Sequence, residues 1–103
     1  MKISEIPQKD LVKGIKGRYF HTDSNTVGFV DIEKGAILPA HSHVHEQITQ
    51  ITEGQLEMTI DGKTQVLEPG TILFIPSNVV HSAVALTDCR VTDIFSPVRE
   101  DYK

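Results

Sequence analysis

Three histidines stand at alternate positions in the segment His41-Ser42-His43-Val44-His45, and Gln47 follows two residues later. Side chains two residues apart on a β-strand lie on the same face, so His41 and His43 can point together into one interior. A further histidine, His81, follows much later in the chain. Imidazole nitrogens gathered in this way suit borderline divalent metals. The pattern therefore predicts a strand that brings nitrogen ligands to a metal ion.

Short apolar segments separated by glycine and proline fill most of the chain. In residues 55–60 every second side chain is apolar, which is the period of a half-buried strand. Asp61-Gly62 is the preferred two-residue hairpin turn, so residues 63–67 should fold back antiparallel. Further strands are predicted at 27–32, 37–43, 47–52, 71–75, 81–86 and 89–95. This succession favours an all-β fold, an antiparallel sandwich or barrel.

The remaining segments carry weaker signals. At 103 residues the chain is expected to form one domain. Residues 71–75 are apolar enough to be buried on both faces of a sheet. The only expected helix is short and lies near residues 4–11.

Composition excludes several classes of function. The formal charge of −4 argues against a nucleic-acid partner, which needs a concentrated basic surface. No apolar stretch approaches the ~20 residues that span a bilayer, and the N-terminus lacks the apolar region of a secretory signal. The single cysteine, Cys89, excludes an internal disulfide and is expected to be a small core residue. We therefore expect a cytoplasmic protein that contacts neither membrane nor nucleic acid.

Two spaced sets of residues resemble the two signature motifs of the cupin superfamily. The first set is Gly35, His41, His43, Gln47 and Gly54; the second is Gly70, Pro76, Asn78 and His81. The resemblance covers about residues 28–95. It implies an antiparallel double-sheet β-barrel of the jelly-roll type, with a barrel core of about residues 26–96 in a single domain 1–103. Asn78 and Ala85 stand where glycine and asparagine are usual.

The resemblance also implies one divalent metal ion, which could be zinc, nickel, manganese or iron. Its ligands would be His41, His43, Gln47 and His81. Gln47 stands where these motifs usually have glutamate, so the site keeps an oxygen ligand but loses one negative charge. A metal there would be a stronger Lewis acid and would be held less tightly. His45 is interpreted as a residue at the rim of the site or one that supports the ligands without binding the metal.

Three segments narrow the resemblance further: 43–48, 74–83 and 93–102. They are similar to the small cupins of pectin and alginate degradation, which linearise 4,5-unsaturated uronates to keto-uronates. Glutamine is among the metal ligands in that family, so Gln47 is expected there. The resemblance implies a metal-dependent ring-opening enzyme with a small carboxylate sugar as substrate.

The catalytic and substrate-binding candidates lie near the C-terminus. Asp93 falls either among the apolar residues Val91 and Phe95 of the barrel interior or on the outer face. Inside, its carboxyl would have a raised pKa suited to general acid–base catalysis, the role that the resemblance implies; the alternative is a structural aspartate hydrogen-bonded to backbone. Phe95 could pack against the sugar ring, although core packing is the simpler role.

Arg99 is the main candidate for binding the substrate carboxylate, because its guanidinium can bind a carboxylate through two hydrogen bonds. The alternative is a rim ion pair with Glu100 or Asp101. Arg18, on an early strand, is a second carboxylate-binding candidate.

Three other functions are compatible with the pattern. One is a cupin dioxygenase, in which a redox-active metal activates O₂ on a small organic substrate. Another is a non-catalytic module that binds a small molecule. A structural metal site is disfavoured, because such sites are usually closed by four protein ligands. The resemblance also implies a homodimer, and an exposed edge strand would favour pairing.

Overall fold

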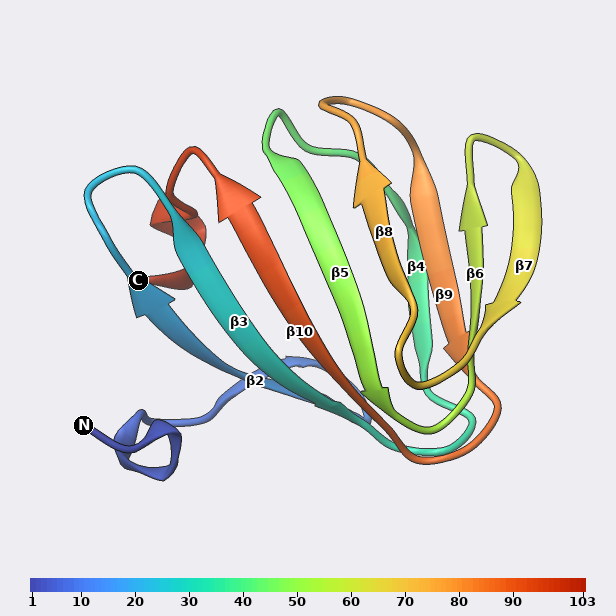
Figure 1. Cartoon of the computed structure of the whole chain (residues 1–103), viewed down its shortest axis with the longest axis horizontal. Coiled ribbons are helices and arrows are strands. Elements are labelled where there is room, and N and C mark those ends of the chain that lie inside the picture. The colour runs from blue at the N-terminus through green and yellow to red at the C-terminus, as the bar shows by residue number, and fades with distance from the viewer.

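The computed structural model describes residues 1–103 and consists almost entirely of β-strands in two antiparallel sheets (Figure 1). One sheet has six strands in the order β1-β2-β3-β10-β5-β8, and the other has four in the order β4-β9-β6-β7. The strands are β1 (Lys9–Val12), β2 (Ile15–His21), β3 (Thr26–Ile32), β4 (Ile37–His41), β5 (Glu46–Glu53), β6 (Leu56–Ile60), β7 (Lys63–Leu67), β8 (Ile72–Ile75), β9 (His81–Ala85) and β10 (Cys89–Ser96). The predicted all-β double-sheet fold is confirmed.

The hydrophobic core lies between the two sheets. It consists of 14 buried residues contributed by both sheets, among them Ile51 and Ile75, which are fully buried. Cys89 belongs to this core, and its Sγ atom lies 3.2 Å from the backbone oxygens of Gln55 and of Thr87, which share the single thiol hydrogen as acceptors. The expected core role of Cys89 is therefore confirmed.

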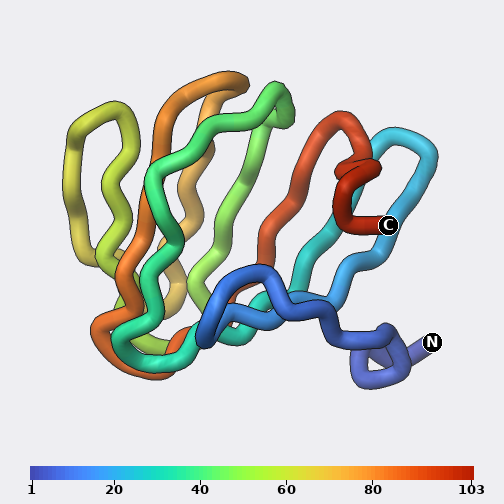
Figure 2. The backbone as a smooth tube through the Cα atoms, turned by 180° about the vertical axis from the view of Figure 1, so that it is seen from behind, coloured from blue at the N-terminus to red at the C-terminus, as the bar shows by residue number.

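The C-terminal segment folds back beside the turn between β2 and β3, as both backbone views show (Figure 2). It ends in the short 3₁₀ helix η2 (Glu100–Tyr102). The backbone N–H of Arg99 donates to Thr26 Oγ1 at 2.8 Å, and Lys9 Nζ donates to the Tyr102 carbonyl at 2.8 Å. These contacts hold the end of the chain over one end of the barrel.

The turns follow the predicted chemistry. Asp61 and Gly62 both have positive φ, 51° and 77°, as a two-residue hairpin turn requires, and Ile60 pairs with Lys63. Asn78, at the position where cupin motifs usually carry glycine, also has a positive φ of 65°. Asparagine tolerates this conformation better than other residues with a β-carbon, so the fold keeps the turn without glycine.

Three expectations about elements need correction. The segment near residues 4–11 is not a helix: the 3₁₀ turn η1 (Ile3–Glu5) is followed by strand β1. The strand predicted at 37–43 ends at His41, so His43 lies in the following loop. β8 is an edge strand with one exposed face, on which Ile72 and Phe74 are 68% and 52% exposed.

Strand β2 was outside the set of predicted strands, although Arg18 was placed on an early strand. Its inward alternation of apolar side chains is interrupted by Gly17. A β-carbon at Gly17 would lie 2.5 Å from the Tyr19 hydroxyl, and one at Gly28 would lie 2.7 Å from the same ring. The two glycines therefore make room for Tyr19, at the expense of the sequence pattern.

The two helical segments of the chain are single 3₁₀ turns, and neither has the length or the apolar character of a membrane-spanning helix.

Candidate functional site

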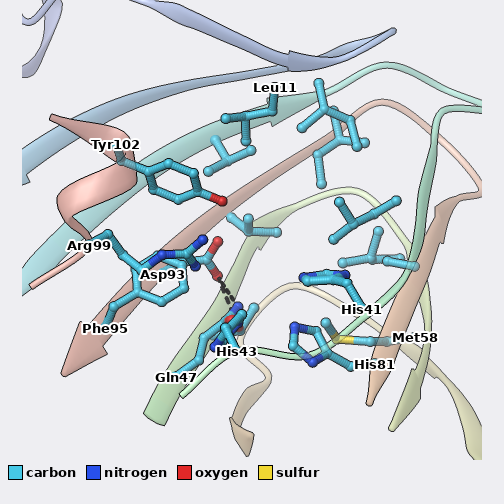
Figure 3. A pocket seen from close by; sticks show the side chains of 18 of the residues that line it. Leu11, His41, His43, Gln47, Met58, His81, Asp93, Phe95, Arg99 and Tyr102 are labelled. Carbon is cyan, nitrogen blue, oxygen red and sulfur yellow. Dashed lines mark hydrogen bonds between the residues drawn. The ribbon is translucent and has the colours of Figure 1, made fainter. Parts of the chain in front are cut away.

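Three of the predicted metal ligands meet at one end of the barrel (Figure 3). His41 ends β4 and His81 begins β9, and the two residues are cross-strand partners in the four-stranded sheet. His43 reaches the same point from the loop after β4. One possible ligand atom from each residue lies within 4.8 Å of the others. This group of three histidines could hold a metal ion.

Each of the three imidazoles is oriented by a backbone carbonyl two residues away in the chain. The Nδ1 atoms of His41, His43 and His81 lie 2.8, 2.9 and 2.9 Å from these oxygens, which belong to Pro39, His45 and Val79. A carbonyl only accepts, so each neutral imidazole carries its proton on Nδ1 and its lone pair on Nε2. Metal-binding histidines commonly donate the other ring N–H to a backbone carbonyl in this way, which fixes the orientation of the ring. His45 contributes its backbone oxygen to this arrangement.

Burial keeps two of these imidazoles neutral. His81 is only 2% exposed, and its Nε2 atom is buried without a hydrogen-bond partner. Burial lowers the pKa of His81 to about 4. Burial, followed by the positive charge of Arg99, also lowers the pKa of His43. At neutral pH their Nε2 lone pairs are therefore available to a cation.

Gln47 faces this group from β5. Its Oε1 atom lies 3.1 Å from His43 Nε2, so two atoms that carry lone pairs face each other. Its Nε2 atom donates to Thr49 Oγ1 at 2.9 Å and to Asp93 Oδ1 at 3.3 Å, which fixes the direction of the amide. A cation between Oε1 and the imidazole would satisfy both acceptors. The donors present, three imidazole nitrogens and an amide oxygen, fit a borderline divalent metal.

Asp93 lies on the inner face of β10, which decides between the two orientations left open by the sequence. Its Oδ1 atom accepts a hydrogen bond from Thr49 Oγ1 at 2.8 Å and the longer one from Gln47. Burial raises the pKa of Asp93 to about 6, although both hydrogen bonds act in the opposite direction. Its partners are side chains, so the alternative of a backbone-bonded structural aspartate does not describe this geometry.

Arg99 is held at the mouth of the same cavity and is only 7% exposed. Asp101 accepts two hydrogen bonds from its guanidinium, from Nε at 3.0 Å and from Nη2 at 2.8 Å. The guanidinium carbon lies 4.8 Å from the centre of the Phe95 ring and 4.0 Å from that of Tyr102. The ion pair with Asp101, the predicted alternative for Arg99, is present, and the guanidinium lines the cavity as well.

The cavity joins these groups to an apolar floor. Its polar wall consists of His41, His43, Gln47, Thr49, His81, Asp93 and Arg99, together with the rings of Tyr19, Phe95 and Tyr102. The rest of the lining is apolar and comes from both sheets, and it includes Leu11 and Met58 (Figure 3). Polar chemistry is therefore confined to one end of the barrel.

Two predicted site residues need separate comment. Phe95 is a core residue that also lines the cavity and meets the His43 ring edge-on at 5.8 Å between centroids. Arg18 does not line the cavity: its guanidinium donates to the backbone oxygens of Ser4 and Ile6. Its neighbours Gly17 and Tyr19 face inward, so alternation turns Arg18 outward. The interpretation of Arg18 as a carboxylate ligand is not supported by this placement.

Sequence reasoning missed Thr49, Tyr19 and Tyr102. Thr49 stands two residues after Gln47 on a predicted strand, so alternation alone would have placed both on one face. Tyr102 comes to the cavity with the C-terminal segment, which was expected to fold back over the mouth, but no local pattern singled out this residue.

The comparison with known families settles the class of this protein. The family described as Cupin domain matches residues 28–95. The chain is a cupin. The solved structure of an RmlC-like cupin from Shewanella frigidimarina superposes with a TM-score of 0.92 and 31% identity, over 97% of this chain and 91% of that one.

More specific similarity is to a group of pectin-degradation cupins. The chain is 34% identical over 101 residues to the pectin degradation protein KdgF of Dickeya dadantii, covering 95% of this chain and 92% of that protein. The structure of KdgF from a Halomonas species has a TM-score of 0.90 at 33% identity, over 97% of this chain and 94% of that one. This protein is thus a KdgF-like cupin with a three-histidine group that could hold a metal.

Proposed function

We propose that this KdgF-like cupin opens the ring of 4,5-unsaturated uronate monosaccharides and gives the linear keto-uronate. The observation that carries the proposal is the position of Gln47 between two groups of different chemistry. Its oxygen faces the histidines, and its nitrogen donates to the partly buried carboxyl of Asp93. The similarity to KdgF, a pectin degradation protein, points to the same class of substrate.

The reaction is an isomerisation that needs no oxidant. The substrate has a C4–C5 double bond, a carboxylate at C5 and a hemiacetal hydroxyl at C1. Removal of the C1 hydroxyl proton forms the C1 carbonyl and breaks the bond between C1 and the ring oxygen. The electron pair remains on that oxygen as an enolate, and protonation of C4 gives the 5-keto product. One proton leaves an oxygen and one is added to a carbon, so the atoms balance.

The side chains of the cavity match these requirements. Asp93, with a pKa of about 6, can accept the proton from the C1 hydroxyl near neutral pH and return one to C4. Arg99 can bind the C5 carboxylate through the guanidinium N–H groups that do not donate to Asp101. His41, His43, His81 and Gln47 would hold a divalent metal, which would supply Lewis-acid stabilisation of negative charge on substrate oxygens. The apolar floor limits access of bulk water from below.

The test is to follow the ultraviolet absorbance of unsaturated uronates made from oligogalacturonate and from oligoalginate by a lyase. We expect the absorbance to disappear faster than the uncatalysed background, with the linear keto-uronate identified by NMR and no O₂ consumed. A rate equal to background on both substrates would refute the proposed function. Oxygen uptake with a phenolic or keto acid would instead support the dioxygenase alternative.

We also propose that two copies pair through the outer face of the six-stranded sheet. One row of apolar side chains crosses this face in register from strand to strand: Phe20, Val27, Ile94, Ile48 and Phe74. Four of these five side chains are exposed in the single chain. Towards the other end of the sheet the same strands carry charges of alternating sign, including the 3.0 Å ion pair of Arg90 with Asp31, which a rotated second copy can complement.

Sedimentation of the native protein tests this pairing. We expect a dimer, and we expect Ile94→Lys to shift it to the monomer. The matched control is Val66→Lys, which changes an exposed apolar residue of the other sheet. A monomer in the unmodified protein, or a dimer that survives Ile94→Lys, would refute this interface.

A further inference from the structure

The guanidinium of Arg99 is constrained on more sides than a carboxylate-binding arginine needs. The rings of Phe95 and Tyr102 lie beside it on two adjacent sides, with their centres 4.8 and 4.0 Å from the guanidinium carbon and 6.0 Å from each other. One edge, formed by Nε and Nη2, is occupied by the carboxylate of Asp101. These contacts leave little rotational freedom to the group.

The open edge of the guanidinium follows from donor counting. A guanidinium has five N–H groups, of which Asp101 takes one on Nε and one on Nη2. Three remain, two on Nη1 and one on Nη2, and they form the end of the planar group. This end is the edge left for a ligand in the cavity that Arg99 lines.

We propose that Asp101 is a positioning residue, which fixes Arg99 so that its Nη1–Nη2 edge receives the carboxylate of a uronate. The inference rests on the proposed function of the site and adds to it a residue that touches no substrate. Asp101 itself has a half-exposed side chain outside the cavity. Its hydrogen bonds from Arg99 lower the pKa of Asp101, so the pair is fully charged at neutral pH.

Charge and orientation predict opposite effects when Asp101 is neutralised. Removal of a negative charge beside Arg99 makes the site more positive, and Coulomb attraction alone would then bind a uronate more tightly. Loss of orientation would bind it more weakly, because an amide at position 101 brings an N–H donor against the guanidinium donors. The sign of the change therefore separates a positioning role from a purely electrostatic one.

The experiment measures binding of D-galacturonate, which lacks the reactive double bond, and of D-galactose, which lacks the carboxylate, to the metal-loaded protein. The variants are Asp101→Asn and Asp101→Glu. The control is Glu100→Gln, which neutralises the adjacent carboxylate, paired with Lys103 instead of Arg99. Thermal melting and metal content verify that each variant is folded and loaded.

We expect the preference for galacturonate over galactose to fall about tenfold in Asp101→Asn, the size of one lost oriented contact. It should recover at least in part in Asp101→Glu and stay unchanged in Glu100→Gln. An unchanged or stronger preference in Asp101→Asn would overturn the inference, as would a wild-type protein without any preference. Turnover of unsaturated uronates with an unchanged preference refutes only the role of Asp101. A lost preference without turnover refutes only the proposed function.

Discussion

The two sheets contribute different chemistry to one cavity. One wall, from the four-stranded sheet and the loop after β4, supplies imidazoles whose Nε2 lone pairs are free. The other wall supplies an acid, Asp93 of the six-stranded sheet, and a cation, Arg99 of the C-terminal segment after β10. Burial acts on the two walls in opposite directions, since it lowers the pKa of His81 to about 4 and raises that of Asp93 to about 6. At neutral pH His81 is therefore neutral and can bind a metal, whereas Asp93 can accept and return a proton. Gln47 is the side chain with contacts to both walls.

Removal of one imidazole should have the largest effect, because it removes one of the three histidine ligands of the metal site. We expect His81→Ala to lose bound metal and at least about 100-fold in activity together. Elemental analysis of the purified protein and the absorbance assay measure the two. His45→Ala is the matched control for metal content, since its ring is outside the converging group. Full metal retention in His81→Ala would show that the ligand set is wrong.

Removal of the Asp93 carboxyl should reduce activity without a loss of bound metal. We expect Asp93→Asn to keep its metal but to lose activity by roughly 100-fold or more, the usual contribution of a general acid–base group. The variant is isosteric, and its Oδ1 can still accept the hydrogen bonds from Thr49 and Gln47. Equal rates in the variant and the wild type would remove Asp93 from the mechanism.

Gln47→Glu tests whether Gln47 couples the histidine group to Asp93. A carboxylate should hold a divalent cation more tightly than the amide oxygen does, by about tenfold or more against a chelator. It also removes the N–H donors to Thr49 and Asp93 and places a like charge beside Asp93. We therefore expect tighter metal and slower turnover in the same variant. Faster turnover with tighter metal would show that the amide does not couple the two walls.

The smallest expected effect concerns stability. Asp93 has a pKa near 6 when folded and about 3.9 when unfolded, so the folded state binds more protons between these values. Asp93 alone therefore makes the free energy of unfolding of the chelator-treated protein fall as pH rises from 4 to 6, whereas the lowered pKa of His81 makes it rise over the same range. The difference between the wild type and Asp93→Asn isolates the contribution of Asp93. Asp93→Asn lacks this term and should be more stable above pH 6, on the order of 1 to 2 kcal/mol. Parallel pH profiles of the melting temperature in the two proteins would contradict the raised pKa.

The elements that depend on residues adjacent in the sequence could be predicted from the sequence alone. The turn at Asp61-Gly62 and the alternation in residues 55–60 were readable because each depends on neighbouring residues. The convergence of His41 with His81 depends on pairing of β4 with β9, which the motif spacing implied and local pattern could not. His43 was expected on the strand, but the chain leaves the sheet after His41, so convergence comes from the loop.

Other features depend on tertiary packing and left no local signal. The apolar residues of β8 indicated burial on both faces, yet nothing in a single chain covers the outer one. Inward-facing Gly17, which makes room for the ring of Tyr19, interrupted the alternation of β2, so this strand was not predicted; the strand at 27–32 was predicted although Gly28 faces the same ring. The contact of Asp101 with Arg99 was considered only as an alternative to substrate binding, whereas the geometry allows both contacts on different edges.

The buried thiol of Cys89 can be used to detect transient opening of the barrel. Cys89 is sealed between the sheets, and burial raises its pKa, so alkylating reagents should meet no reactive thiolate in the closed barrel. Any modification then records an excursion in which the sheets separate. The ratio of the labelling rates with and without added metal would measure how much metal binding at the histidine group suppresses opening of the sheets around Cys89.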